Sequence, residues 1–430
     1  MTPDRTVPPK ISDFVRLDLP PAEVAEIDDG VVAHIINVGT SKANRITVMH
    51  SFGKKDFKPL FAVEALPQML LQGTKNLSGA QIADKLDFYG AFINPTSRSA
   101  FTTLDVLSLN SFNRPILETL QDVISNPIFP EERFDVLKRK ALMNFDLMCT
   151  HSKFIAAETL KELLAGKKHS YETRVDRKDI EDTNVNDVVR AWHDGFSRSK
   201  IHVFAAGDIS DAVLDNIKAF AKNIKPHDIK TDVHPTLPYC PEKAGHYFIE
   251  KPDSKQTAIS IGIPTIQRNS PDYIPLRIAV MALGGYFSSR LMTKIREELG
   301  LTYGINAYLG ANIEGSNIHI AAQCDPNNVD EVIKEIQNQI TLLATQPMSE
   351  EEFSRLKSYY MTTIASTLES FTSVCDYYES QLTVGIPSDY FFKQQEILRT
   401  VTPEILSEMI YKYCKFDEAR TVVAGRKPGL

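Results

Sequence analysis

The sequence predicts an α+β fold made of two homologous halves, because features of the first half return in the second at a nearly constant spacing. The motif Phe-x-x-Leu-Lys occurs at 134–138 and again at 353–357, an offset of 219 residues (353 − 134). Apolar strand patterns end at Gly207 and Gly425, an offset of 218 residues (425 − 207). Separated features that share one offset indicate a duplicated unit.

The same offset suggests where the two units begin and end. Asn184 and Thr402, each placed to cap a helix, also lie 218 residues apart (402 − 184). Residues 223–243 are rich in Pro and His, a composition typical of a linker. We therefore expect an N-terminal α+β domain at 1–222 and a C-terminal α+β domain at 244–430.

Each element of the first half is predicted from its own pattern. An Asp-Gly turn at 29–30 joins two strands within 25–36 into a hairpin. Ser78 and Gln81 have the spacing of a capping box, which opens a helix that runs to Tyr89. Apolar periodicity predicts further strands at 45–51, 100–109 and 201–206, and helices at 61–71, 116–124, from 131, at 184–196 and from 211.

Composition describes an ordinary globular chain of 430 residues, of which 43% are hydrophobic and 24% charged. The net charge of −7 and the lack of a basic stripe argue against nucleic acid or an acidic membrane as a partner. No apolar run approaches the roughly 20 residues of a spanning helix, and none follows the first charges as in a signal peptide. We expect a cytoplasmic protein, with a periplasmic one as the alternative. Five widely spaced cysteines indicate reduced, buried thiols.

The stretch 283–307 combines a glycine turn, a short helix, a helix stop and a strand. Gly284 and Gly285 are expected to end a preceding apolar helix and to form a flexible or close-packed turn. Ser288 or Ser289 is expected to cap the helix that follows.

That short helix should end at Gly300 and lead into a strand at 301–307. Arg296 in its last turn and Tyr303 at the start of the strand then flank one tight corner. The buried face of the helix is expected to hold Leu291, Ile295 and Leu299. From this short motif alone, Arg296 could equally pair with a neighbouring glutamate on a solvated helix, and Tyr303 could be an ordinary strand aromatic.

The run Ser-Ser-Arg-Leu followed by Arg-Glu-Glu-Leu-Gly-Leu-x-Tyr, within 288–303, resembles the C-terminal signature of the pitrilysin, insulinase and mitochondrial processing peptidase family of zinc peptidases. The resemblance extends over nearly the whole chain. It implies two α/β-sandwich halves, each an antiparallel-rich mixed sheet packed by helices, that form half of a clamshell chamber. It also implies that Arg296 and Tyr303 hold the substrate near the scissile bond. The residues implied to touch substrate are Gly284, Gly285, Ser288 and Ser289.

The family's zinc motif, His-x-x-Glu-His, is degenerate in this sequence. The motif places two histidine ligands one helical turn apart, and its glutamate takes a proton from zinc-bound water. The segment 69–74 and the Ser78 cap align with the residues that follow the motif, so its five positions hold Glu64, Ala65, Leu66, Pro67 and Gln68. Pro67 is expected to disturb this helical turn. The third ligand position maps to about Asn144, with Asp146 as the ligand if the alignment slips.

This chain is therefore expected to hold no metal. It keeps the two residues that hold the substrate in the family, Arg296 and Tyr303. The resemblance implies the zinc-free, substrate-binding subunit of a heterodimeric zinc metallopeptidase acting on peptides. In that interpretation a homologous partner supplies the zinc, and Arg296 and Tyr303 donate hydrogen bonds to the scissile carbonyl in trans. The alternative is a non-catalytic scaffold or peptide-binding subunit of a larger complex. A stand-alone enzyme with an unrecognised site is a third hypothesis.

Overall fold

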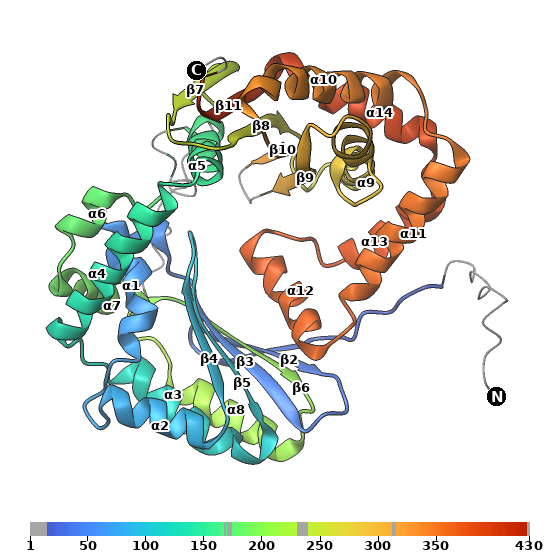
Figure 1. Cartoon of the computed structure of the whole chain (residues 1–430). Helices are drawn as coiled ribbons and strands as arrows, with labels where there is room; N and C mark the ends of the chain where they lie inside the picture. Colours follow the sequence, from blue (N-terminus) through green and yellow to red (C-terminus); the bar gives the residue numbers. More distant parts are fainter. Residues whose placement is uncertain (1–14, 167–168, 170–173, 230–239, 312–314, 428–430) are drawn as a thin grey trace, which may run out of the picture.

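The computed structural model describes residues 15–166, 169, 174–229, 240–311 and 315–427. Two mixed β-sheets, one from each half of the sequence, are packed by helices, so the predicted α+β fold is confirmed (Figure 1). The predicted domain boundaries stay a prediction, and much of the predicted linker lies outside the described residues. Within the described ranges, no helix is both long and apolar enough to cross a membrane.

The first sheet has six strands, and only one neighbouring pair is parallel. The strands are β1 (Glu23–Asp28), β2 (Val31–Asn37), β3 (Ala43–His50), β4 (Phe92–Ser97), β5 (Thr102–Leu109) and β6 (Ile201–Gly207). Their order is β1-β2-β6-β3-β5-β4, in which β2 and β6 run parallel and all other neighbours run antiparallel. The predicted hairpin between β1 and β2 turns at Gly30, whose φ of 74° favours glycine.

The predicted helices of the first half are present in the predicted order. The helices of this half are α1 (Leu60–Leu70), α2 (Gly79–Phe88), α3 (Asn113–Ser125), α4 (Glu131–Met148), α5 (Ser152–Ala165), α6 (Arg177–Asp182), α7 (Val185–Asp194) and α8 (Asp211–Asn223). Of these, α5 and α6 are two further helices that were not predicted. The capping box at the start of α2 is present, because the Ser78 hydroxyl accepts from the Gln81 N–H and the Gln81 side chain accepts from the Ser78 N–H. Asn184 caps α7 through its side chain, also as predicted.

The second sheet repeats five of the six strands in the same order. Its strands are β7 (Gly245–Glu250), β8 (Thr257–Thr265), β9 (Thr302–Ala311), β10 (Ser316–Cys324) and β11 (Arg420–Gly425). The order β7-β11-β8-β10-β9 corresponds to β2-β6-β3-β5-β4, and the parallel pair β7 and β11 corresponds to β2 and β6. The duplication predicted from the spacing is thus visible in the topology. It also makes β4 and β9 equivalent edge strands.

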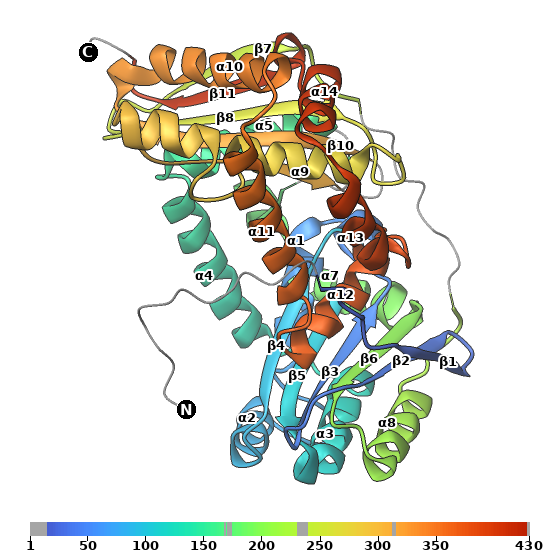
Figure 2. The same ribbon diagram turned by 90° about the vertical axis from the view of Figure 1, so that its right-hand side faces the viewer.

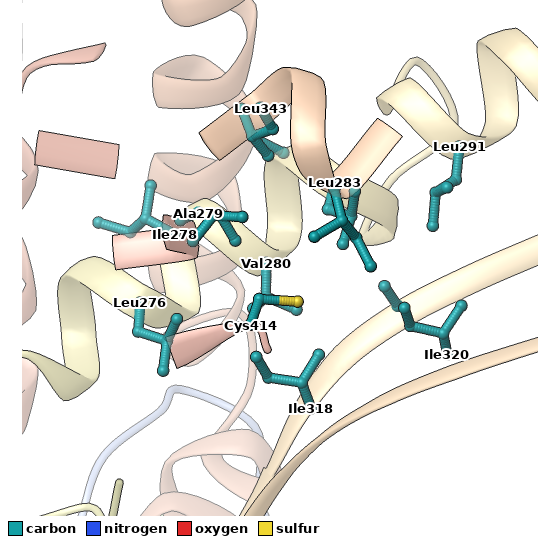
Figure 3. Close-up of a cluster of buried hydrophobic side chains, with 14 of the residues drawn as sticks. Leu276, Ile278, Ala279, Val280, Leu283, Leu291, Ile318, Ile320, Leu343 and Cys414 are labelled. Atoms are coloured by element: carbon teal, nitrogen blue, oxygen red, sulfur yellow. The ribbon is translucent and has the colours of Figure 1, made fainter. Parts of the chain in front are cut away.

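The core of the second half lies between this sheet and the helices above it. Those helices are α9 (Tyr273–Gly284), a π-helix (Met292–Glu298), α10 (Val329–Thr345), α11 (Glu350–Ser366), α13 (Tyr390–Thr400) and α14 (Pro403–Tyr413). The remaining helix of this half is α12 (Phe371–Thr383). Figure 3 shows Ile278, Val280 and Leu283 of α9 beside Ile318 and Ile320 of β10. α9 is apolar on nearly every side, which is typical of a helix buried between layers.

The two halves exchange a helix, a feature the sequence analysis did not predict. α5 of the first half packs on β8 and β11 of the second sheet, where Leu160 contacts the cluster of Ala258, Val422 and Ala424. α12 of the second half packs on β2, β3 and β6 of the first sheet, where Val374 joins another buried cluster. Figures 1 and 2 show these helices against the sheet of the other half. The halves are therefore structurally interdependent.

Candidate functional site

The helix at the degenerate motif positions, α1, is held at its N-terminus by a carboxylate. The backbone N–H groups of Leu60 and Phe61 donate to the Asp179 side chain at 3.1 and 2.6 Å. An acceptor at this end of a helix satisfies free donors and complements the helix dipole. α1 then continues through Pro67 to Leu70 as one helix. Pro67 does not end the helix, but it has no N–H to donate to the Val63 carbonyl, so one helical hydrogen bond is missing at this turn.

The structure brings two of the four degenerate positions together. Glu64 of α1 and Asn144 of α4 line one cavity of about 510 Å³. Pro67 is buried in the core, and Gln68 is exposed. Asp146, the alternative to Asn144, forms an ion pair on the protein surface with Arg177 of α6. Glu64 and Asn144 thus face one cavity, and their assignment to former ligand positions stays a prediction.

Basic side chains dominate the walls of this cavity. Lys54 lies beside Glu64, with 3.2 Å between Nζ and Oε2, and Lys161 lies beside Glu158, with 2.6 Å between Nζ and Oε1. Two guanidinium groups complete the charged lining, so that four cations face two carboxylates; they belong to Arg98 and Arg174.

These residues do not fit a zinc ion. Protein zinc sites use imidazole, thiolate and carboxylate ligands, whereas Glu64 here is engaged by a lysine and Asn144 offers only an amide. Among the described residues, no group of three or more His, Cys, Asp or Glu side chains is placed to hold a metal ion. The excess of cations around the cavity also repels a divalent cation.

Backbone pairing explains why Lys54 and Arg98 share this cavity. The N–H of Lys54 donates to the carbonyl of Arg98 at 3.0 Å, and the N–H of Lys55 donates to the carbonyl of Ser99 at 2.9 Å. A Cβ at Gly53 would lie 2.3 Å from the Ser99 carbonyl oxygen, so only glycine permits this approach. The sequence analysis missed these cationic residues, because they are distant in sequence and no motif links them.

The second predicted site begins where α9 ends at Gly284. A Cβ at Gly284 would lie 2.6 Å from the backbone nitrogen of Ala307, so this glycine lets the helix end pack directly on β9. Gly285 is the C-cap of α9 and lies against Met281. The turn is therefore close-packed, and contact of either glycine with a substrate stays a prediction.

Neither predicted serine caps the next helix with its side chain, so this prediction is wrong. Ser288 is exposed and lines a different cavity, together with Arg290. Ser289 is 1% exposed, and its hydroxyl has no hydrogen-bond partner among the described residues. The backbone carbonyl of Ser289 opens the helical turn instead, accepting from the Thr293 N–H at 2.9 Å. The physical reason is that the Ser289 side chain points into the protein, away from the free N–H groups.

The helix after this turn is a π-helix, which changes its buried face. The Leu299 N–H donates to the Lys294 carbonyl, five residues back, at 3.1 Å. Leu291 and Ile295 are fully buried as predicted, whereas Leu299 is 40% exposed. The prediction for Leu299 is wrong because the wider turn rotates it away from the core. Gly300, with a φ of 65°, ends the helix as predicted.

Arg296 and Tyr303 lie on two elements that contact each other, the π-helix and β9. The Arg296 guanidinium stands 4.9 Å from the centre of the exposed Phe287 ring. It has no carboxylate partner among the described residues, since Glu298 pairs with Lys294 at 2.8 Å. Tyr303 is 88% exposed on the edge strand. Within the described part of the chain, its hydroxyl makes no hydrogen bond, so it is accessible to an external partner, whereas the Arg296 side chain is half-buried.

Comparison with known proteins agrees with this fold. Residues 183–360 match the family described as "Peptidase M16 inactive domain". "Uncharacterized zinc protease YmxG" from Bacillus subtilis is 20% identical over 72% of this chain and 74% of its own length. "Cytochrome b-c1 complex subunit 1, mitochondrial" from Homo sapiens is 23% identical over 81% of this chain and 75% of its own length.

A solved structure shows the same fold. The peptidase M16 inactive domain from Pseudomonas fluorescens has a TM-score of 0.84 to this chain and 19% sequence identity, and the match covers 94% of this chain and 98% of that one. Residues 183–360 therefore match the M16 peptidase family, and the solved structure shows the same two-sheet α+β fold over nearly the whole chain. The matched stretch, residues 183–360, is of the inactive type and includes Arg296 and Tyr303.

Proposed function

We propose that this chain is the zinc-free, substrate-binding subunit of a two-chain metallopeptidase that acts on peptides. A homologous partner supplies the zinc and its ligands. Arg296 and Tyr303 reach the partner's site and donate hydrogen bonds to the scissile carbonyl as it becomes an oxyanion. The proposed compartment is the cytoplasm, with the periplasm as the alternative. The five free cysteines, three of them buried, are compatible with a reducing compartment.

The accessibility of Arg296 and Tyr303 carries this proposal. A structural arginine or tyrosine at a corner between a helix and a strand is expected to find a partner within its own chain. Tyr303 instead projects from an edge strand, and the Arg296 guanidinium lies over the exposed Phe287 ring without a carboxylate partner among the described residues. Preorganised donors without internal partners suit a ligand that arrives from outside.

The cationic cavity supports the division of labour between two chains. Because the residues around Glu64 do not fit zinc, the proposal assigns the metal and the general base to another polypeptide. The inactive type of the matched domain supports the same assignment.

The second candidate is a non-catalytic scaffold or peptide-binding subunit of a larger complex. One relative, from Homo sapiens, is by its name a subunit of the cytochrome b-c1 complex. In that role Arg296 and Tyr303 have no part in turnover. The two candidates therefore differ in whether an assembled complex needs this chain in order to cleave peptide.

The test is reconstitution with a zinc-bearing relative that carries an intact His-x-x-Glu-His. We expect a 1:1 complex in sedimentation, about one zinc per heterodimer by metal analysis, and peptide cleavage only by the mixture. The isolated chain should retain no zinc after mild chelation. Cleavage by the zinc-bearing chain alone at the rate of the mixture would favour the scaffold, and stoichiometric zinc on the isolated chain would contradict both candidates.

A further inference from the structure

We propose that the cavity between α1 and α4 binds the carboxylate of an extended peptide. The cavity is the one of about 510 Å³ lined by Glu64 and Asn144, and we call it the cationic cavity. That it binds an anion follows from its own residues. That the anion belongs to a peptide rests on the proposed function.

Two guanidinium groups of the cationic cavity have no carboxylate partner among the described residues. Glu64 is paired with Lys54, and Glu158 is paired with Lys161. The two guanidinium groups belong to Arg98 and Arg174, and that of Arg174 lies 6.0 Å from the centre of the Phe145 ring. A guanidinium is a planar fork of donors that fits a carboxylate with two parallel hydrogen bonds. The cavity is therefore prepared for an oxyanion.

Two buried hydroxyl groups also favour the binding of an oxyanion in this cavity. Ser97 and Ser99 line the cationic cavity on either side of Arg98; Ser97 is the last residue of β4, and Ser99 lies in the turn between β4 and β5. Their hydroxyl oxygens are inaccessible to solvent, and neither has a hydrogen-bond partner within the described part of the chain. An unsatisfied buried hydroxyl is costly, and a bound carboxylate supplies the missing acceptor.

A second cavity shows where the rest of a peptide would lie. It has a volume of about 410 Å³ and shares Arg98, Ser99 and Lys161 with the cationic cavity. It extends to Tyr308 and Gly310 on the edge strand β9. An edge strand offers unpaired backbone groups to an extended chain, which is a common mode of peptide recognition. Because the two cavities share a wall, the C-terminal carboxylate of a bound peptide would contact the cationic side chains. The preceding residues of the same peptide would lie along β9.

Titration calorimetry of the purified chain tests this inference without a partner subunit. The probes are an N-acetylated Ala/Ser pentapeptide with a free C-terminal carboxylate, the same peptide as its C-terminal amide, and inorganic phosphate. We expect the acid peptide to bind at least about tenfold more tightly than the amide, as loss of one charge-assisted hydrogen bond predicts. Arg98→Ala and Arg174→Ala should each weaken binding of the acid peptide by about tenfold or more.

Ser99→Ala separates ligand binding from folding. The Ser99 hydroxyl has no hydrogen-bond partner among the described residues, so removing it should leave the thermal midpoint of unfolding unchanged or raise it. The acid peptide should bind several-fold more weakly to this variant. Arg114→Ala is the matched control, since Arg114 is exposed on α3, pairs with Glu118 and lies outside both cavities. It should leave the affinity unchanged.

Equal affinities of the acid and amide peptides, or the lack of binding by both, would overturn the inference. Phosphate that binds more tightly than the acid peptide and is not displaced by it would overturn the peptide assignment in favour of a phosphate ligand. The outcome is independent of turnover. A reconstituted peptidase with full activity and no acid-peptide binding refutes this inference alone, and acid-peptide binding by a chain that supports no turnover refutes the proposed function alone.

Discussion

Replacing Arg45 should loosen the exchanged helix α12 from the first sheet. Arg45 on β3 contacts Asp105 at 3.2 Å, Glu379 at 3.1 Å and also Asp376, and the last two residues belong to α12. Its Nη1 lies 3.5 Å from the carbonyl oxygen of Thr372, at the start of the same helix. The side chains of Arg45 and Glu379 are each 14% exposed. One guanidinium therefore joins the two halves at a largely buried site.

The expected loss of stability in Arg45→Met is about 3 kcal/mol, the lower end of the range for removing one partner of a buried ion pair. The lower end applies because Asp376 is largely exposed and Asp105 keeps a hydrogen bond from the Thr47 hydroxyl at 2.7 Å. Glu379 is then left as a buried carboxylate without its cation, which is the main source of the loss.

The loss should also depend on pH. Burial raises the pKa of Glu379, and the Arg45 guanidinium opposes that rise. Without Arg45 the folded-state pKa of Glu379 rises further above its unfolded value, so the folded state binds the proton more tightly. The penalty is therefore fully present above the folded pKa and declines as the pH falls towards the unfolded value. Arg45→Met should be less destabilised at mildly acidic pH than at neutral pH.

Hydrogen exchange of the α12 amides is the appropriate assay, because it reports local opening in a chain of this size. Exchange in α12 should accelerate at neutral pH and recover partly at acidic pH, while exchange in α10 is unchanged. The control is Arg114→Met, whose exposed ion pair with Glu118 contributes at most about 0.5 kcal/mol. Unchanged α12 exchange in Arg45→Met, or an equal effect at both pH values, would refute this interpretation of the ion-pair network.

The reciprocal helix, α5, should be equally important for the second sheet. Leu160→Ala removes a buried side chain from its contact with β8 and β11 and should destabilise the protein by about 2–5 kcal/mol in urea unfolding. Glu162→Ala, an exposed position on the same helix, should change stability by no more than about 0.5 kcal/mol. If Leu160→Ala were as stable as Glu162→Ala, the packing of α5 on the second sheet would not contribute to the stability of the protein.

The sequence was sufficient to predict the duplicated fold, because the repeat and most elements depend on local patterns. The Ser78 capping box and the Gly300 helix stop are examples, since each depends on residues within one turn. β4 was missed because its alternation is interrupted by polar residues and Pro95. The helix exchange was missed because α5 and α12 were not predicted as separate helices, and a local pattern does not show which sheet a helix covers.

The part of the candidate site that lies in one short sequence motif could be predicted. The part whose residues are brought together only by folding could not. Arg296 and Tyr303 lie seven residues apart (303 − 296) and were recognised together. The cationic cavity draws Lys54, Arg98 and Arg174 from segments far apart in sequence. The π-helix also could not be predicted, because the spacing of Leu291, Ile295 and Leu299 equally suits an α-helix.

Turnover by the reconstituted complex carrying Tyr303→Phe tests the central claim most directly. The substitution removes one hydroxyl and leaves the ring in place, so lost activity belongs to a hydrogen bond. Tyr411→Phe is the matched control, an exposed tyrosine on α14. We expect Tyr303→Phe to lower kcat by about 10²-fold or more without changing assembly or thermal midpoint, and Arg296→Ala to lower it comparably. Wild-type turnover by Tyr303→Phe, indistinguishable from Tyr411→Phe, would contradict the claim that this chain contributes to a peptidase active site.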